Sequence, residues 1–156
     1  MTGTCRSDLR SEFGRLLSIV AVLMLGLLPP QLRAQSPRAV TVIGLDYAFQ
    51  APDTLPAGPV TLSLLNRGTV RHELIFLVLN EGRTLGELLK ATTLEARMAL
   101  SRPVGLIFAE PGQPADAQLI VHLLPGRSYV FLCVLRDGPD KPPHAAMGMA
   151  KTLVVN

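Results

Sequence analysis

The sequence has few cysteines, no long apolar run and no cluster of positive charge, and each shortage excludes a class of protein. Cys5 and Cys133 are the only cysteines among 156 residues. The longest apolar run covers residues 16–28, short of the roughly 20 residues that a bilayer span requires. No run of lysine or arginine suggests nucleic-acid binding. Neither HExxH nor a Ser–His–acid pattern occurs, so we predict that the chain is not an enzyme.

The first 34 residues have the pattern of a secretory signal peptide. Arg6, Arg10 and Arg15 precede the apolar run, and two prolines end it. A basic segment, a short apolar segment and then a small residue are typical of such signals. We predict cleavage after Ala34, export to the periplasm or the medium, and no stable membrane insertion afterwards. An uncleaved N-terminal anchor is the alternative, and the shortness of the run speaks against it.

Removal of residues 1–34 changes the chemistry of the remaining chain. It takes away four arginines, one aspartate and one glutamate, which lowers the formal charge from +3 to +1. It also removes Cys5, so Cys133 cannot form an internal disulfide and must be buried, metal-bound or paired with another chain. The 122 residues that remain, 35–156, suit one domain, which we expect to be a monomer.

Short β-rich stretches separated by glycine and proline dominate residues 35–156. The predicted strands cover 39–49, 59–66, 70–80, a short stretch after 102, the two arms of a hairpin over 117–135 with PGRS at its turn, and 149–156. Seven or eight such strands indicate an all-β fold, a Greek-key β-sandwich.

One segment has a helical period instead. In residues 84–100 leucines recur at helical spacing with charged residues between them, which predicts an amphipathic helix or two short ones. Thr84 followed by Glu87 resembles a capping box. We therefore predict one short helical insertion in the sandwich, and the sequence assigns it no role.

Five side chains could form a site, although each alone is more typical of a structural role. Cys133 lies in an apolar strand, where a free cysteine is usually a core residue. His72 lies in a strand, His144 follows two prolines in a loop, and Met147 and Met149 come shortly after it. A further histidine, His122, is expected to be structural. Together, however, two imidazoles, a thiolate and a weak thioether are the donors that hold copper for one-electron transfer.

At these residues the chain resembles the cupredoxin family, the plastocyanin- and azurin-like blue copper domains. The likeness lies in NRGTVRHEL (66–74) and in CVLRDGPDKPPHAAMGM (133–149), and it extends over nearly all of residues 35–156. It implies a cupredoxin-like sandwich that holds one type 1 copper ion through His72, Cys133 and His144, with Met149 as axial ligand. The ten residues between Cys133 and His144 are a departure, because small plastocyanin-like proteins have a much shorter gap.

The axial ligand has two candidates. Met147 follows His144 at a spacing like that of amicyanin, and Met149 at the spacing of plastocyanin. The Gly148–Met149 pair and the strand that follows favour Met149.

The resemblance implies an exported one-electron carrier with a redox partner that the sequence does not name. Copper storage, delivery or sensing is one alternative, and a metal-free interaction module is another. The complete donor set argues against the metal-free module. The thiolate argues for electron transfer, because exported copper carriers can rely on methionine and histidine alone.

Overall fold

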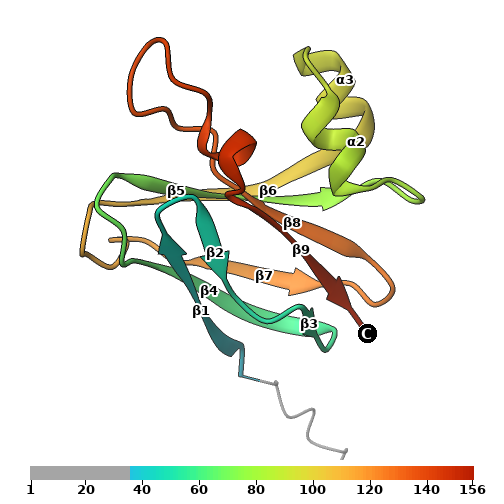
Figure 1. Cartoon of the computed structure of the whole chain (residues 1–156). Coiled ribbons are helices and arrows are strands. Elements are labelled where there is room, and N and C mark those ends of the chain that lie inside the picture. The colour runs from blue at the N-terminus through green and yellow to red at the C-terminus, as the bar shows by residue number, and fades with distance from the viewer. Residues whose placement is uncertain (1–35) are drawn as a thin grey trace, which may run out of the picture. The chain divides into compact units, whose positions relative to one another are not determined.

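The computed structural model describes residues 36–156, which form two β-sheets packed face to face (Figure 1). The predicted signal peptide, its cleavage point and Cys5 lie outside the described residues. The first sheet has the order β2 (Ala48–Gln50), β1 (Arg38–Leu45), β4 (Gly58–Asn66), β7 (Leu119–Leu123). The second has the order β3 (Thr54–Leu55), β9 (Ala150–Val155), β8 (Ser128–Leu132), β5 (His72–Leu79), β6 (Ser101–Ala109).

The core follows from the alternation along the strands. In β1 and β4 every second side chain is buried, so Val42, Leu62 and Leu64 face the second sheet. Across the gap, Phe76 of β5 stacks on Tyr129 and Phe131 of β8. Because side chains in a strand point alternately to the two faces, this pattern buries one face of each sheet. The predicted all-β sandwich is confirmed.

Strand β5 is buried on both of its faces, which explains its continuous apolar sequence HELIFLVL. One face lies in the core between the sheets. The other contributes Leu77 and Leu79 to a second apolar cluster, which Leu88 of the helical insertion and Ala145 of the C-terminal loop complete. Because β5 is packed on both faces, the residues at its two ends are held in fixed positions.

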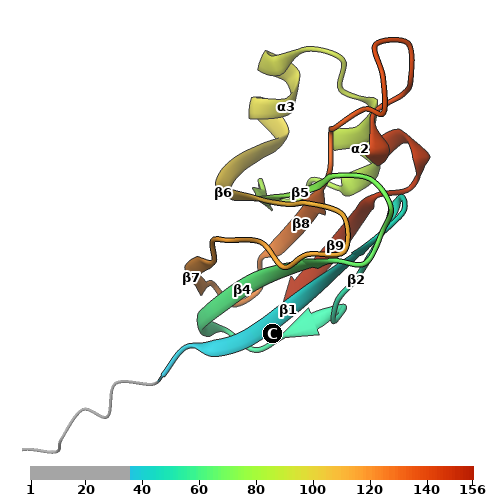
Figure 2. The same cartoon turned by 90° about the vertical axis from the view of Figure 1, so that its left-hand side faces the viewer.

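The helical insertion consists of two short helices, α2 (Leu85–Lys90) and α3 (Leu94–Leu100), between β5 and β6. The predicted capping box is confirmed: the Glu87 amide donates to the Thr84 hydroxyl at 3.2 Å, and the Thr84 amide donates to the Glu87 carboxylate at 2.8 Å. Both helices lie on the outer face of the second sheet, beside the loop before β9 (Figures 1 and 2). No helix within residues 36–156 has the length and apolarity of a membrane span.

Two local predictions were wrong. The stretch 39–49 is not one strand, since the chain turns at Tyr47, whose φ is +63°, and returns as β2; with β3 this makes nine strands in the described part. Strands β7 and β8 are not a hairpin, because β7 pairs with β4 in the first sheet and β8 pairs with β5 and β9 in the second. A Pro-Gly turn suits a hairpin and a crossing between sheets equally well, so distant partners decided the pairing.

Candidate metal centre

The predicted ligands lie where three adjacent strands of the second sheet meet one end of the sandwich. His72 is the first residue of β5, and Cys133 directly follows β8. His144 opens the short 3-10 helix η2 (His144–Met147), and Met149 directly precedes β9. Because β8 is antiparallel to both β5 and β9, the end of β8 lies beside the starts of its two neighbours, and the side chains converge.

Three donor atoms form a compact, buried cluster. The Nδ1 atoms of His72 and His144 are 3.2 Å apart, and the Cys133 sulfur is 3.4 Å from Nδ1 of His144. All three donors lie within 4.8 Å of one another, and the side chains are at most 1% exposed. An ion at about 2.0–2.1 Å from imidazole nitrogen and about 2.3 Å from thiolate sulfur can contact all three at these separations. The residues therefore fit a transition-metal ion.

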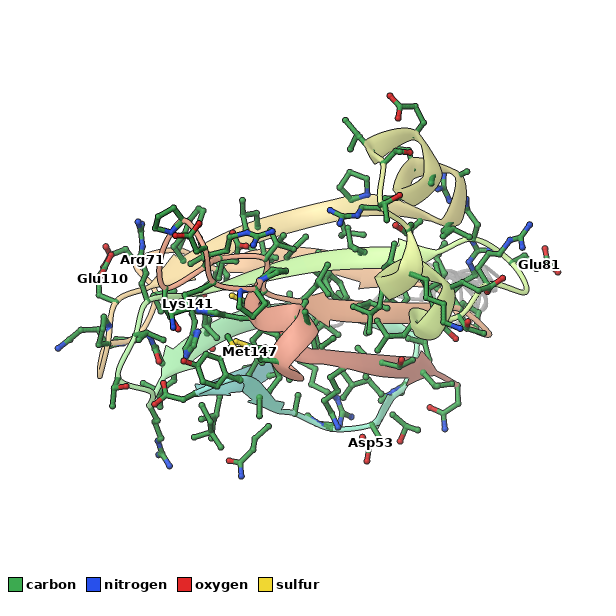
Figure 3. The ribbon with its side chains drawn as sticks, turned by 45° about the horizontal axis from the view of Figure 1, so that its top comes forward. Asp53, Arg71, Glu81, Glu110, Lys141 and Met147 are labelled. Carbon is green, nitrogen blue, oxygen red and sulfur yellow. The ribbon has the colours of Figure 1, made fainter. Side chains whose placement is uncertain are left out.

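The two candidate methionines differ in their surroundings. Met149 is fully buried, while Met147 on η2 is 36% exposed and lies at the surface of the molecule (Figure 3). A Cβ atom at Gly44 would meet both the Met149 methyl group and the His72 ring at 3.5 Å. Met149 thus packs beside the histidine cluster, and the side chain of Met147 points to solvent.

Backbone hydrogen bonds close the long loop between Cys133 and His144 at its base. The His144 amide donates to the Leu135 carbonyl at 2.9 Å, and the Ala145 amide donates to the Cys133 carbonyl at 2.7 Å. The Cys133 amide in turn donates to the Met149 carbonyl at 3.1 Å. The ten residues between Cys133 and His144 therefore form a loop whose two ends are held together by hydrogen bonds, and the donor cluster stays buried.

Two carboxylates lie behind the imidazoles. Nε2 of His144 is 2.9 Å from Asp137, whose second oxygen accepts from the Tyr47 hydroxyl at 2.7 Å. The hydrogen bond from Tyr47 and then that from His144 lower the pKa of Asp137 below its ordinary value. An ionised acceptor at Nε2 keeps the proton there and leaves Nδ1 free for the cluster. Sequence reasoning did not connect Asp137 with the site, and an acidic residue inside the long gap between Cys133 and His144 was the available signal.

The second carboxylate, Asp46, is 3.5 Å from Nε2 of His72, which has no hydrogen-bond partner within residues 36–156. The Thr69 amide and hydroxyl both donate to Asp46 and hold it in place. The Thr69 amide is also the main reason that the pKa of Asp46 is lowered. Nothing in the sequence pattern linked Asp46 to the site, because it reaches His72 only through the fold.

A glycine makes room for this arrangement. A Cβ atom at Gly68 would lie 2.3 Å from the Asp46 carboxylate and 2.8 Å from Nε2 of His72. The Gly68 amide donates to the side chain of the fully buried Asn66, which itself donates to the carbonyls of Val70 and Ala109. The NRGT loop is thereby fixed against the imidazole of His72.

The sulfur of Cys133 is shielded from water. Burial raises the pKa of the thiol, and the nearby backbone of Glu73 and Leu135 partly opposes this shift. Glu73 is itself 4% exposed and accepts from the Val134 amide at 2.8 Å, and burial raises the pKa of its carboxyl group. A metal ion would displace the thiol proton, because thiolate is the ligating form.

His122, predicted to be structural, is exposed on β7 and lies outside the donor cluster.

No protein-family model and no curated protein sequence matches the chain. Among solved structures, reduced auracyanin from the photosynthetic bacterium Roseiflexus castenholzii is similar at a TM-score of 0.52, with 18% identity over 78% of this chain and 99% of that one. Auracyanin A from Chloroflexus aurantiacus, described as a blue copper protein, is similar at a TM-score of 0.50, with 20% identity over 78% of this chain and all of the other. At this identity the likeness shows the fold. The chain therefore has the cupredoxin fold of the blue copper proteins, and one end of its sandwich carries a His–Cys–His cluster consistent with a type 1 copper site.

Proposed function

We propose that the protein is an exported one-electron carrier that binds one copper ion through His72, Cys133 and His144, with Met149 as axial ligand. The observation that carries the proposal is the buried His–Cys–His cluster, with its two Nδ1 atoms and one sulfur within 4.8 Å of one another. Two imidazoles, a thiolate and a weak thioether are the donors of copper electron-transfer sites. Bound copper would supply the reversible exchange of a single electron.

The protein's own part is to hold these donors still. The cluster is anchored at the ends of adjacent strands, and the hydrogen bond behind the imidazole of His144 and those at the loop base restrict its movement. A ligand set fixed in this way is preorganised, so little rearrangement accompanies a change of charge at the centre. The donors are also buried, which leaves little room for a substrate and favours a carrier over an enzyme.

Copper reconstitution with a visible spectrum tests the proposal. We expect intense blue or green absorption from thiolate-to-Cu(II) charge transfer, and Cys133→Ser should abolish the colour while the β-rich circular dichroism spectrum persists. A colourless wild-type protein with copper bound would refute the carrier function.

The axial ligand can be tested with a matched pair of variants. Met149→Leu should keep the colour and raise the reduction potential, because a weak donor to Cu(II) is lost. Met147→Leu, two residues away on the exposed side of η2, should change neither. The reverse result would assign the axial position to Met147.

Export and the monomeric state belong to the same proposal. The pattern of residues 1–34 supports a cleaved signal. N-terminal sequencing of the secreted protein should give Gln35 as the first residue, and size-exclusion chromatography should give a monomer. A membrane-bound protein that begins at Met1 would contradict the cleavage.

A further inference from the structure

We propose that a groove between the helical insertion and the loop after Cys133 is the docking site for an acidic redox partner protein, which inserts an apolar segment there. The groove encloses about 660 Å³ on the outer face of the second sheet. Its floor comes from β5, β6 and β8, one wall from α2 and α3, and the other from residues 134–146. This inference rests on the proposed electron-carrier function and names the class of its partner.

The wall formed by the helices has apolar side chains that the fold leaves uncovered. Leu94 is 70% exposed, Met98 51% and Leu89 46%, and α3 has no buried residue at all. A surface helix normally buries its apolar stripe, and a cluster of exposed apolar side chains marks an interaction surface. Across the groove Val134, 37% exposed, continues the apolar lining.

The groove is also connected to the metal centre through covalent bonds. Its lining includes Val134, the residue after Cys133, and Ala145, the residue after His144. A protein seated there would be separated from two candidate copper ligands by single peptide units. Nε2 of His144 is itself engaged by the Asp137 carboxylate at 2.9 Å.

Positive charge at the groove indicates the chemistry of the partner. Arg97 and Arg136 belong to the lining, and their guanidinium groups donate to the backbone carbonyls of Ala91 and Lys141. Neither forms an ion pair with a carboxylate in the part of the chain that the structure describes. Arg71, in contrast, is paired with Glu110 (Figure 3), and neither residue belongs to the lining of the groove. The two uncompensated arginines favour a partner whose apolar segment is flanked by aspartate or glutamate.

The test uses the complete exported protein, as it is after any natural cleavage of the signal, loaded with copper. The exported protein fraction of the source organism serves as reductant, and the loss of the charge-transfer colour gives the rate. Met98→Asp and Arg97→Glu should each lower the rate about tenfold or more, the effect of losing a strong interface contact. Arg38→Glu, the same charge change on β1 in the other sheet, should leave the rate unchanged. The wild-type rate should fall with added salt, and Arg97→Glu should weaken that dependence.

The outcomes separate this proposal from the one on which it rests. A protein without colour would remove the carrier function itself. Normal colour and potential, with equal rates for all variants, would overturn the groove and leave the carrier function intact. A reductant that passes a dialysis membrane and shows the same sensitivity to Met98→Asp would make the occupant a small molecule and overturn the proposal. Dimers that Met98→Asp dissociates would overturn it in favour of a second copy of this chain.

Discussion

The substitution Asp137→Asn should weaken copper binding although residue 137 is not a ligand. The carboxylate accepts from Nε2 of His144 at 2.9 Å and from the Tyr47 hydroxyl at 2.7 Å. Asparagine has nearly the same shape, but it carries no charge, and its amide nitrogen cannot accept, so at most one of the two hydrogen bonds remains. Removing such a partner behind a metal-bound histidine typically lowers metal affinity about 10- to 100-fold.

Competition with a copper chelator, followed by the charge-transfer colour, measures that loss. The reduction potential should also rise, because the lost negative charge stabilised Cu(II) more than Cu(I). Tyr47→Phe removes one hydrogen bond and keeps the carboxylate, so it should cost less than Asp137→Asn. Asp140→Asn, on the same loop and exposed, is the matched control and should change neither quantity. Wild-type affinity and potential in Asp137→Asn would refute the supporting role of this carboxylate.

Three further predictions concern the loop, the core and the response to pH. Gly68→Ala should lower copper affinity, because the new Cβ would lie 2.8 Å from Nε2 of His72. Gly86→Ala is the control and should leave the affinity unchanged, since the nearest atom there is 3.9 Å away. Equal copper affinity for the two variants would contradict the argument. Phe76→Ala should lower the free energy of unfolding by about 3–5 kcal/mol in urea titrations, since this ring is fully buried, and a loss below about 1 kcal/mol would show a poorly packed core. Burial lowers the pKa of His72 below its ordinary 6.5. The imidazole of His72 is therefore harder to protonate in the folded, copper-free protein than in the unfolded chain. The contribution of neutral His72 to stability should be fully present above pH 6.5 and be lost as the pH drops through the lowered value. His72→Gln should therefore reduce the slope of stability against pH, and an unchanged slope would contradict the argument.

Much of the fold could be predicted because its causes are local. Alternation in β1 and β4 buries every second side chain, and it requires a second apolar layer wherever it occurs. The Thr84–Glu87 pair marks the start of α2 because both hydrogen bonds of the cap form within four residues. Cys133, His144 and Met149 lie close together in the chain, so a closed loop was enough to bring them near one another.

The choice of partners for β7 and β8 depended on residues far away in the chain. The turn between them permits pairing with each other, yet β7 pairs with β4, and β8 lies between β5 and β9. Burial of apolar faces decides between such arrangements, and it is a property of the whole sandwich. The groove beside α3 is likewise formed by elements that are distant along the chain, so no short stretch of the sequence predicts it.

The donor types were readable from the sequence by itself, and their surroundings were decided by the tertiary structure. Asp46 and Asp137 lie behind the two imidazoles only because β1 ends, and the long loop runs, at the end of the sandwich where β5 begins. Met147 and Met149 are two residues apart, yet the left-handed turn at Gly148, with φ +116°, leaves one exposed and the other buried. A sequence specifies which donor side chains exist, whereas the burial of each side chain and the direction in which it points depend on contacts between segments that are distant along the chain.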